Sequence, residues 1–407
     1  MDSRLKVLMV TEGFYPDGFG GAHTYVYNLS KTLAKAGHDV YVITIKPGKD
    51  ALSNETIDGI KVLRYSTALC GPLLFILRPV LSIINSRAMF YALQKKVGFD
   101  IVNFHHPLPA FGISRSSACR GIRKVYTFHS SMAEDVKTQI RKKRYFPHIL
   151  DGIANSLIKY IENECLKHCS AIVALSMFSL RYLTGTYGQD ERKITLIPGG
   201  VDTDKFIPCP DKRAKRTELL IPHDGIIFLT ARRLVARMGI ENLIRAFKHV
   251  TDKNKDAILI ILGDGFLREK LLKITEDEGM KRSIIFKGAV EATRMPGYYQ
   301  ACDVFIIPSE QDEWFGLVTI EALSCGIPVL GTPIGATPEI LGKIDGSLLF
   351  PGTSSEAIAK GMFNFIAKKD HYSGKSRELR KYAEENYSWK AVSARTEEVY
   401  YEKQKNR

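Results

Sequence analysis

The residues whose types and spacing most clearly suggest binding or catalysis lie in the segment PSEQDEWFGLVTIEALSCGIPVLGT, which begins at Pro308. Glu313 precedes a predicted helix over 317–324, and Glu321 lies more than a turn inside that helix. A carboxylate can accept two hydroxyl hydrogen bonds at once, which suits a ribose diol or a sugar ring. The backbone N–H groups at the start of the helix would face a phosphate; they belong to Phe315, Gly316 and Leu317.

A basic turn earlier in the same half of the chain has the composition of a diphosphate site. Arg232, Arg233 and Arg237 follow a predicted strand and precede a predicted helix over 241–250. Cations beside a helix N-terminus bind a diphosphate well, because the helix dipole and the charges act together. An ordinary solvated basic turn has the same composition, so this motif alone leaves both interpretations open.

Further candidates also come directly after predicted strands. Gly263 and Asp264 lie in a Gly-Asp-Gly turn, and Gly20 and Gly21 end a loop in which no side chain would block a phosphate. His129 follows another strand, at the edge where ligands bind in parallel sheets. The alternatives are tight turns for the glycines and a histidine that is hydrogen-bonded to the backbone.

The elements that must position these residues are strands that alternate with helices. Short apolar runs predict one series of strands over 5–11, 39–45, 101–104, 124–128, 171–175 and 194–197, and a second over 226–230, 257–262, 284–287, 303–307 and 327–330. This alternation predicts an α/β protein with two parallel, Rossmann-like sheets. The expected domains are 1–205 and 206–385, joined by a proline-containing linker, with a C-terminal helix over 386–407 that we expect to pack back on the first domain.

The net charge of +14 is unevenly distributed. Residues 1–200 carry 26 Lys and Arg against 15 Asp and Glu, whereas the other 207 residues carry 32 against 29. A basic patch in the first half precedes Tyr145 and Phe146; its members are Lys137, Arg141, Lys142, Lys143 and Arg144. The patch and the apolar segment 73–84 predict contact with an acceptor or with an anionic membrane surface. A solvated basic helix and an ordinary buried helix remain the alternatives.

Several classes of protein are disfavoured by what the sequence lacks. No run of about 20 apolar residues predicts a membrane span, and the N-terminus does not have the form of a signal peptide. The seven cysteines form no Cys-x-x-Cys pair, and no histidine or carboxylate cluster has metal-ligand spacing, so we expect neither a metal nor another cofactor. No basic-aromatic RNA motif or helix-turn-helix accompanies the positive charge, so we expect no nucleic-acid partner. We expect a cytoplasmic protein that binds the cytoplasmic membrane face peripherally.

Taken in order, these motifs resemble glycosyltransferase family four, whose members are retaining enzymes of the GT-B fold. The resemblance covers nearly the whole chain and rests on five motifs: Phe14-Tyr15-Pro16 with Gly20-Gly21, Ile197 to Asp202, Arg233-Leu234 with Met238-Gly239, Gly263 to Gly265, and Glu313 with Glu321. The resemblance implies two Rossmann-like domains that face each other across a cleft. It also implies transfer of a hexose from a UDP- or GDP-sugar to a lipid-linked or glycan acceptor, without a metal.

The family pattern implies a role for each matched residue. Glu321 would hold the nucleotide ribose, Glu313 would lie by the donor sugar, and Arg233 would neutralise the diphosphate. The backbone of 315–317 would cradle the sugar and the distal phosphate, and His129 would contact the reacting sugar from the first domain. The other expected donor-binding residues are Gly20, Gly21, Arg237, Gly263 and Asp264.

One position departs from the family pattern. Met238 occupies the place of a lysine, and a thioether cannot neutralise a diphosphate. Arg237 or Arg232 is expected to supply that charge. Sugar-nucleotide 2-epimerases share the two-domain architecture and are an alternative, although the Glu313–Glu321 helix and the Arg233 turn fit transfer better. A basic nucleic-acid-binding protein is the alternative from another class.

Overall fold

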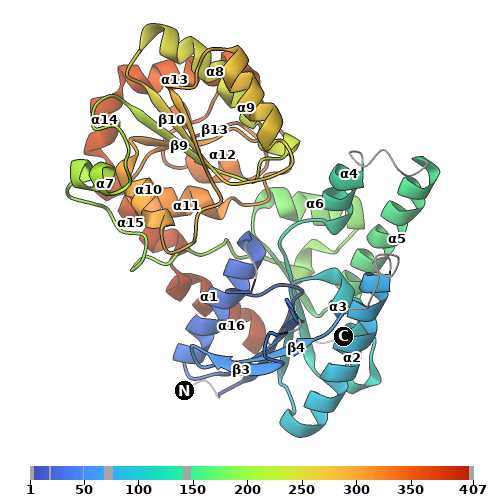
Figure 1. Ribbon diagram of the computed structural model, residues 1–407. Coiled ribbons are helices and arrows are strands. Elements are labelled where there is room, and N and C mark those ends of the chain that lie inside the picture. The colour runs from blue at the N-terminus through green and yellow to red at the C-terminus, as the bar shows by residue number, and fades with distance from the viewer. Residues whose placement is uncertain (1–3, 18–19, 49, 68–76, 141–147, 403–407) are drawn as a thin grey trace. The chain divides into compact units, whose positions relative to one another are not determined.

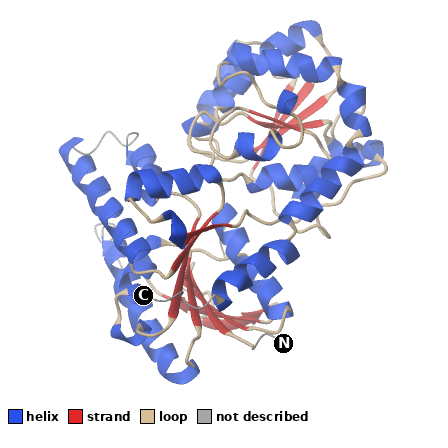
Figure 2. Ribbon diagram, turned by 180° about the vertical axis from the view of Figure 1, so that it is seen from behind, coloured by secondary structure: helices blue, strands red, loops and turns tan. Residues whose placement is uncertain are grey.

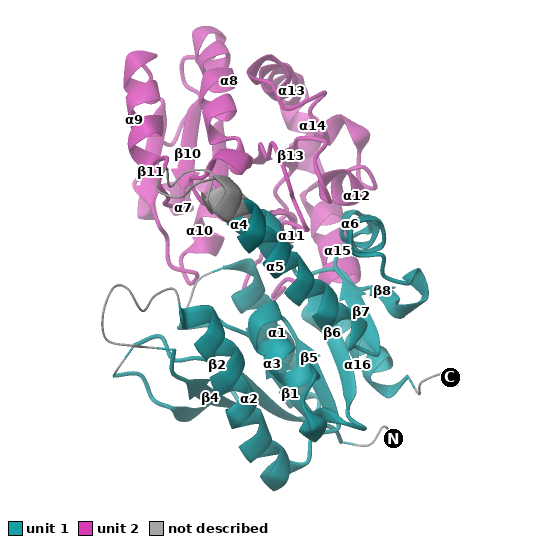
Figure 3. Cartoon of the chain, turned by 90° about the vertical axis from the view of Figure 1, so that its right-hand side faces the viewer, with its two compact units in different colours: residues 1–199, 389–407 teal, residues 200–388 magenta. Residues whose placement is uncertain are grey.

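The computed structural model describes residues 4–17, 20–48, 50–67, 77–140 and 148–402, without the side chains of 137–140 and 148–151. The chain forms two compact units (Figure 3). The first contains residues 1–199 and 389–407, and the second contains residues 200–388. The chain therefore leaves the first unit at Gly199 and returns to it at Trp389.

Within the described residues, the first unit contains an eight-stranded sheet in the order β3-β4-β2-β1-β5-β6-β7-β8 (Figure 1). Its strands are β1 (Lys6–Val10), β2 (Asp39–Ile45), β3 (Asn54–Ile57), β4 (Ile60–Tyr65), β5 (Ile101–Phe104), β6 (Arg123–Phe128), β7 (Ala171–Ala174) and β8 (Ile194–Leu196). Only the β3–β4 pair is antiparallel among these neighbours. The central strands β1, β5, β6 and β7 are largely buried, as expected of a sheet with helices on both faces.

The helices of the first unit cover this sheet (Figure 2). They are α1 (Gly21–Lys35), α2 (Arg78–Val97), α3 (Pro107–Ser114), α4 (Met132–Ile140), α5 (His148–Lys167), α6 (Met177–Tyr187) and α16 (Trp389–Tyr401), with short 3-10 turns η2 (Ser117–Cys119) and η3 (Glu191–Lys193). The C-terminal helix α16 packs on α1, where the Trp389 and Tyr25 rings are 5.2 Å apart. Its Tyr400 hydroxyl accepts a hydrogen bond from Asn103 on β5 at 2.8 Å.

The second unit contains a five-stranded parallel sheet in the order β11-β10-β9-β12-β13. The strands are β9 (Ile227–Ala231), β10 (Ile258–Leu262), β11 (Ile284–Gly288), β12 (Val304–Ile307) and β13 (Val329–Gly331). The helices are α7 (Lys212–Glu218), α8 (Ile240–Lys253), α9 (Arg268–Asp277), α10 (Met295–Ala301), α11 (Leu317–Ser324), α12 (Thr337–Leu341), α13 (Ser355–Ala367), α14 (Lys369–Gly374) and α15 (Ser376–Tyr387), with 3-10 turns η4 (Ala236–Met238) and η5 (Gly346–Leu348). Two parallel α/β sheets confirm the predicted fold class.

The predicted strands did not include the β3–β4 hairpin. Its Asp58-Gly59 turn, with both residues at positive φ, is a strong hairpin signal that the search for apolar runs overlooked. Strand β3, with the sequence Asn-Glu-Thr-Ile, is polar and half exposed because it forms the edge of the sheet. An edge strand has no second neighbour and needs no continuous apolar run.

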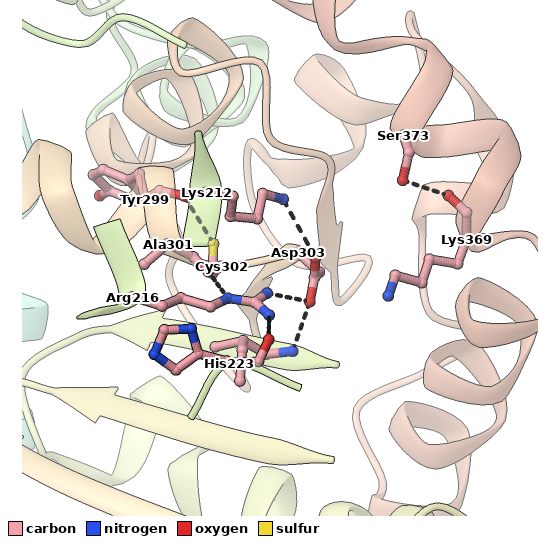
Figure 4. A network of polar contacts seen from close by, with 10 residues as sticks. Lys212, Arg216, His223, Tyr299, Ala301, Cys302, Asp303, Lys369 and Ser373 are labelled. Carbon is pink, nitrogen blue, oxygen red and sulfur yellow. Dashed lines mark hydrogen bonds and ion pairs between the residues drawn. The ribbon is translucent and has the colours of Figure 1, made fainter. Parts of the chain in front are cut away.

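A buried polar network fastens α7 to the second sheet (Figure 4). The Arg216 guanidinium, which is 5% exposed, donates to the carbonyls of Ala301 and His223 and to the Asp303 carboxylate, at 2.9, 2.7 and 2.8 Å. Asp303 also accepts the Ile227 backbone N–H at 2.8 Å. Burial would raise the pKa of Asp303, but Lys212, the Ile227 N–H and Arg216 together lower it, so the carboxylate is charged at neutral pH.

Removing the arginine charge from this network should strongly destabilise the second unit. Arg216→Met keeps most of the side-chain length but leaves the Asp303 carboxylate buried without its main partner, so we expect a loss of about 3–5 kcal/mol in the free energy of unfolding. Lys212→Met is the matched control; the Lys212 side chain is 37% exposed, and we expect a loss below about 1 kcal/mol. Urea denaturation at neutral pH measures both variants, and equal stabilities would contradict this role.

Candidate active site

Glu313 of the second unit lies in a buried ion pair rather than in solvent. The Glu313 and Arg232 side chains are 8% and 6% exposed, and Oε2 of Glu313 accepts hydrogen bonds from Arg232 Nη2 and from Ser309 Oγ, the latter at 2.6 Å. The same Arg232 nitrogen lies 2.8 Å from the Met238 sulfur. Arg232 is therefore already neutralised by Glu313, and it does not supply a free charge in place of the lysine that Met238 replaces.

The two neighbouring arginines have different surroundings. Arg233 is exposed directly after β9, and its guanidinium has no hydrogen bond or ion pair among the described residues. Arg237 is half-buried in η4 and donates to the Asp312 carbonyl at 3.0 Å. Of the three arginines of this turn, Arg233 is the one whose charge is most available to an anionic ligand.

The Gly-Asp-Gly turn after β10 packs closely against this arginine turn. Gly263 has φ +120°, and a Cβ atom at this position would lie 1.9 Å from the Arg232 carbonyl oxygen, so only glycine fits. Asp264 is exposed, and its backbone carbonyl accepts the Leu234 N–H at 2.9 Å. The turn thus places the ends of β9 and β10 side by side.

The start of α11 offers backbone donors next to Glu313. Gly316 caps the helix in the left-handed region with φ +83°, and a Cβ there would lie 3.2 Å from Glu313 Oε1. The N–H groups of Phe315, Gly316 and Leu317 have no backbone acceptor within the described chain. Free N–H groups at a helix N-terminus form a ready anion site.

Glu321 lies farther along α11, next to a buried tyrosine. The Tyr299 hydroxyl donates to Glu321 Oε2 at 2.8 Å. Burial raises the pKa of the Glu321 carboxyl, and the bond from Tyr299 and the charge of Lys205 partly oppose the rise. Oε1 makes no hydrogen bond to another described residue, so it is available to a hydroxyl donor.

His129 of the first unit belongs to a cluster of aromatic side chains at the carboxyl ends of β1, β5 and β6. Its Nε2 lies 3.0 Å from His105 Nδ1, and its ring lies 4.8 Å from the Tyr25 ring in an edge-on geometry. Burial, followed by the nearby His23 and His106, lowers the pKa of His129 to about 3. The ring is therefore neutral at physiological pH.

The contacts of His105 fix the proton position on His129. A thioether sulfur has no hydrogen to donate, so His105 Nε2, which lies 3.4 Å from Met9 Sδ, must be the protonated nitrogen. Burial lowers the pKa of His105 as well, so its Nδ1 is an acceptor. His129 Nε2 then donates to His105, and His129 Nδ1 is left as a hydrogen-bond acceptor.

A second polar group in the first unit was not identified from the sequence. Glu12, just after β1, accepts from Ser82 Oγ at 2.5 Å and lies 3.1 Å from His106 Nδ1. Ser82 is also 2.9 Å from the buried Tyr65 hydroxyl. The rule that singled out His129 also applies to Glu12 and His106, because both lie two residues after strand ends.

The remaining sequence-predicted residues are only partly described. Gly20 precedes α1 and Gly21 begins it, which places them at the carboxyl edge of β1. Arg141, Lys142, Lys143 and Arg144 lie outside the described residues, and the side chain of Lys137 is not described. In the described part of the chain, no group of three or more histidines, cysteines or carboxylates could hold a metal ion. No helix of that part is long and apolar enough to cross a bilayer.

Two parallel α/β units, with an anion site at a helix N-terminus and carboxylates beside it, define the class of GT-B glycosyltransferases. Family models match both parts of the chain: Glycosyltransferase Family 4 over residues 19–205 and Glycosyl transferases group 1 over residues 211–386. The chain belongs to glycosyltransferase family four and is a glycosyltransferase. Matches to transferase models in both halves favour transfer over the epimerase alternative.

Curated relatives are similar over most of the chain. An uncharacterized glycosyltransferase of Methanocaldococcus jannaschii is 26% identical over 97% of this chain and 98% of its own. A GDP-mannose-dependent alpha-(1-6)-phosphatidylinositol monomannoside mannosyltransferase of Mycolicibacterium smegmatis is 30% identical over 61% of this chain and 65% of its own. A phosphatidylinositol N-acetylglucosaminyltransferase of Homo sapiens is 25% identical over 97% of this chain and 75% of its own.

Solved structures share the fold. A sucrose-phosphate synthase of Thermosynechococcus elongatus superposes with a TM-score of 0.81, at 20% identity and 98% coverage of both chains. HepE of Anabaena, solved with UDP-glucose, superposes with a TM-score of 0.73 at 17% identity, over 97% of this chain and 99% of its own.

Proposed function

We propose that this glycosyltransferase moves a hexose from a UDP- or GDP-sugar to a lipid-linked or glycan acceptor, with retention of configuration at the anomeric carbon. The observation that carries the proposal is the arrangement around α11. Free N–H groups at its N-terminus, the exposed Arg233 nearby and the Glu321 carboxylate within it match a diphosphate, its counter-charge and a ribose diol. Relatives that act on phosphatidylinositol or its mannoside support a lipid-linked acceptor.

In the proposed reaction, breaking the glycosyl–phosphate bond develops negative charge on the departing phosphate. The guanidinium of Arg233 and the N–H groups of 315–317 would stabilise that charge as it forms. The leaving phosphate would accept the proton of the acceptor hydroxyl on the same face of the sugar, so no protein nucleophile is needed. His129 Nδ1 would accept a hydrogen bond from a hydroxyl of the donor sugar.

A screen of UDP- and GDP-hexoses against phosphatidylinositol, its mannosides and free glycans tests this function. Proton NMR of the product gives the anomeric configuration, and inversion would contradict the retaining mechanism. We propose that activity persists in excess EDTA, because the arginine and the helix N-terminus would neutralise the diphosphate charge that a metal otherwise neutralises. Complete loss of activity that Mn²⁺ or Mg²⁺ restores would contradict the metal-free proposal.

Arg237 is the residue that we expect to compensate for Met238. Arg237→Ala should raise the donor KM by about tenfold, the effect of one lost charge-assisted contact, and Met238→Lys should restore it at least partly. Arg232→Ala is not a clean comparison, because it leaves the buried Glu313 without its partner. Steady-state kinetics with the donor varied provides the measurement. An unchanged donor KM in Arg237→Ala would mean that another residue supplies the charge missing at Met238.

We also propose that the first unit binds the surface of an anionic membrane peripherally, on the cytoplasmic side. Two of its helices expose apolar side chains at helical spacing: Val80, Ile84 and Tyr91 on α2, and Ile153, Leu157 and Tyr160 on α5, each 48–61% exposed. Helix α3 lies between α2 and α5 and contacts both (Figure 1). The basic patch directly precedes α5 in the sequence. Apolar side chains beside a basic segment are typical of interfacial helices.

Liposome co-sedimentation tests this surface. Each basic residue near an anionic bilayer contributes about 1 kcal/mol, so changing Arg141, Lys142, Lys143 and Arg144 to Gln should release the protein. Ile84→Ser with Ile153→Ser and Leu157→Ser should also weaken binding. Leu52→Ser with Leu220→Ser, which removes exposed apolar side chains from elsewhere, is the matched control and should have no effect. Equal partition of all variants at low salt would favour a solvated basic face and a soluble acceptor.

A further inference from the structure

A concave surface lies at the opposite edge of the first sheet from His129. The amino-terminal ends of three strands and the end of α16 line it. The strand ends contribute Ile101 of β5, Arg123 of β6 and Ser170, which precedes β7. Its volume is about 1140 Å³. A smaller hollow of about 310 Å³ shares three lining residues with it: Arg120, Lys124 and His168. The two hollows therefore lie next to each other.

The carboxylates that line this surface already have partners. Asp190 pairs with Arg192 at 2.7 Å, Glu402 pairs with Arg123 at 3.4 Å, and Asp100 accepts the Lys6 backbone N–H at 2.8 Å. Arg192 and Arg123 thus balance the charges of Asp190 and Glu402, whereas Asp100 keeps its negative charge because its partner is a neutral N–H group.

Three lining cations remain without a counter-charge. In residues 4–402 as far as they are described, the side chains of Arg120, Lys124 and Lys193 make no hydrogen bond or ion pair. The buried thiols near Lys124 do not compensate it, because burial raises the pKa of Cys119 to about 11 and that of Cys169 further, so both are uncharged. The lining of the larger hollow has five basic and three acidic side chains, so it carries an excess of two positive charges.

Hydroxyl groups lie in the same place. Ser114, Ser116 and Ser117 line the smaller hollow together with Arg115. Ser114 is 3% exposed, and its Oγ has no hydrogen-bond partner within the described chain. Ser116 Oγ accepts the Ala118 N–H, which leaves its own hydrogen free to donate. His168 lines both hollows, and its Nδ1 donates to the Glu164 carbonyl at 2.7 Å.

We propose that this surface, centred on Arg120, Lys124 and Lys193, is a second binding site, which takes an anion that carries two or more phosphate groups. Guanidinium and ammonium groups together with hydroxyl donors are the side chains that hold phosphate oxygens. Several unpaired cations in one hollow match a ligand with several negative charges better than a single carboxylate. The site is formed by the strand ends remote from His129, so its ligand does not replace the donor sugar there.

Inorganic tripolyphosphate is the probe for this site. Isothermal titration and hydrogen–deuterium exchange should show that the probe binds the full-length protein and slows exchange in residues 115–124. Arg120→Gln with Lys124→Gln and Lys193→Gln should weaken this binding by about tenfold or more and abolish the protection of 115–124. The exchange readout separates this site from phosphate binding near Arg233, and neither readout depends on transferase activity.

Lys255→Gln with Arg282→Gln and Lys360→Gln is the matched control, because it makes the same change in net charge on exposed positions of the second unit. It should retain the protection of 115–124. Protection in the Arg120, Lys124 and Lys193 variant equal to that in the wild type, or no protection by the probe in either protein, would overturn the proposal. Vesicles of phosphatidylcholine with and without phosphatidylinositol 4,5-bisphosphate distinguish the source of the phosphates. Competition by the acidic vesicles would identify a lipid headgroup, and its absence would identify a soluble ligand.

Discussion

Glu321→Ala should reduce kcat/KM for glycosyl transfer by about 30- to 1000-fold while the protein stays folded. Two hydrogen bonds from a ribose diol to this half-buried carboxylate are worth about 2–4 kcal/mol net, and alanine replaces neither. The raised pKa of Glu321 adds a pH signature. The carboxyl must be ionised to accept both hydroxyls, so donor KM should begin to rise, as the pH is lowered, at a higher pH than for an ordinary glutamate, whose pKa is about 4.3.

The neighbouring tyrosine provides the comparison for this variant. Tyr299→Phe removes the hydroxyl that donates to Glu321 Oε2 but keeps the carboxylate, so it should cost less activity than Glu321→Ala. Without that donor the pKa of Glu321 should rise further, and the acid limb of the pH profile should move to higher pH. Normal turnover in a folded Glu321→Ala protein would contradict the proposed donor site.

His129→Ala should lower kcat by about 10²–10³-fold, the range for one lost polar contact at a reacting centre. We expect the contact to strengthen toward the transition state, since the donor is held mainly by the second unit. The dissociation constant for the free nucleoside diphosphate should therefore barely change. Calorimetry with the diphosphate and kinetics with the full donor separate the two effects.

The lowered pKa of His129 predicts that this histidine does not contribute to the pH dependence of kcat near neutral pH. A histidine with a pKa of about 3 is neutral throughout the physiological range. Any titration of kcat near pH 6.5 should therefore persist in His129→Ala. His249→Ala, which removes an exposed histidine of the second unit, is the control and should not change kcat. Weaker diphosphate binding with unchanged kcat would place His129 at the nucleotide instead.

The sequence was sufficient for the features that have a local signature. Apolar runs predicted the central strands, because strands covered on both faces must be apolar throughout, as in β10. The order of the motifs identified the family that the comparisons confirm. Strand ends also located His129 and the arginine turn, because ligand-binding residues of parallel sheets lie at those ends.

Features that depend on contacts between distant residues could not be predicted. The burial of Arg232 against Glu313 joins residues 81 positions apart, and no spacing rule connects them. The proton position on His129 depends on Met9, 96 positions from His105. The roles of Glu313, Arg233 and the glycine turns remain predictions from the family pattern.

The return of α16 to the first unit has a consequence for synthesis of the chain. Residues 200–388 form one continuous stretch, so the second unit is complete as soon as it leaves the ribosome. The first unit, although translated first, lacks Trp389 beside Tyr25 and Tyr400 beside Asn103 until α16 emerges. Domains usually finish folding in the order of translation. Here the order of completion is reversed, and a ribosome stalled before α16 has emerged would hold a finished second unit and an unfinished first one.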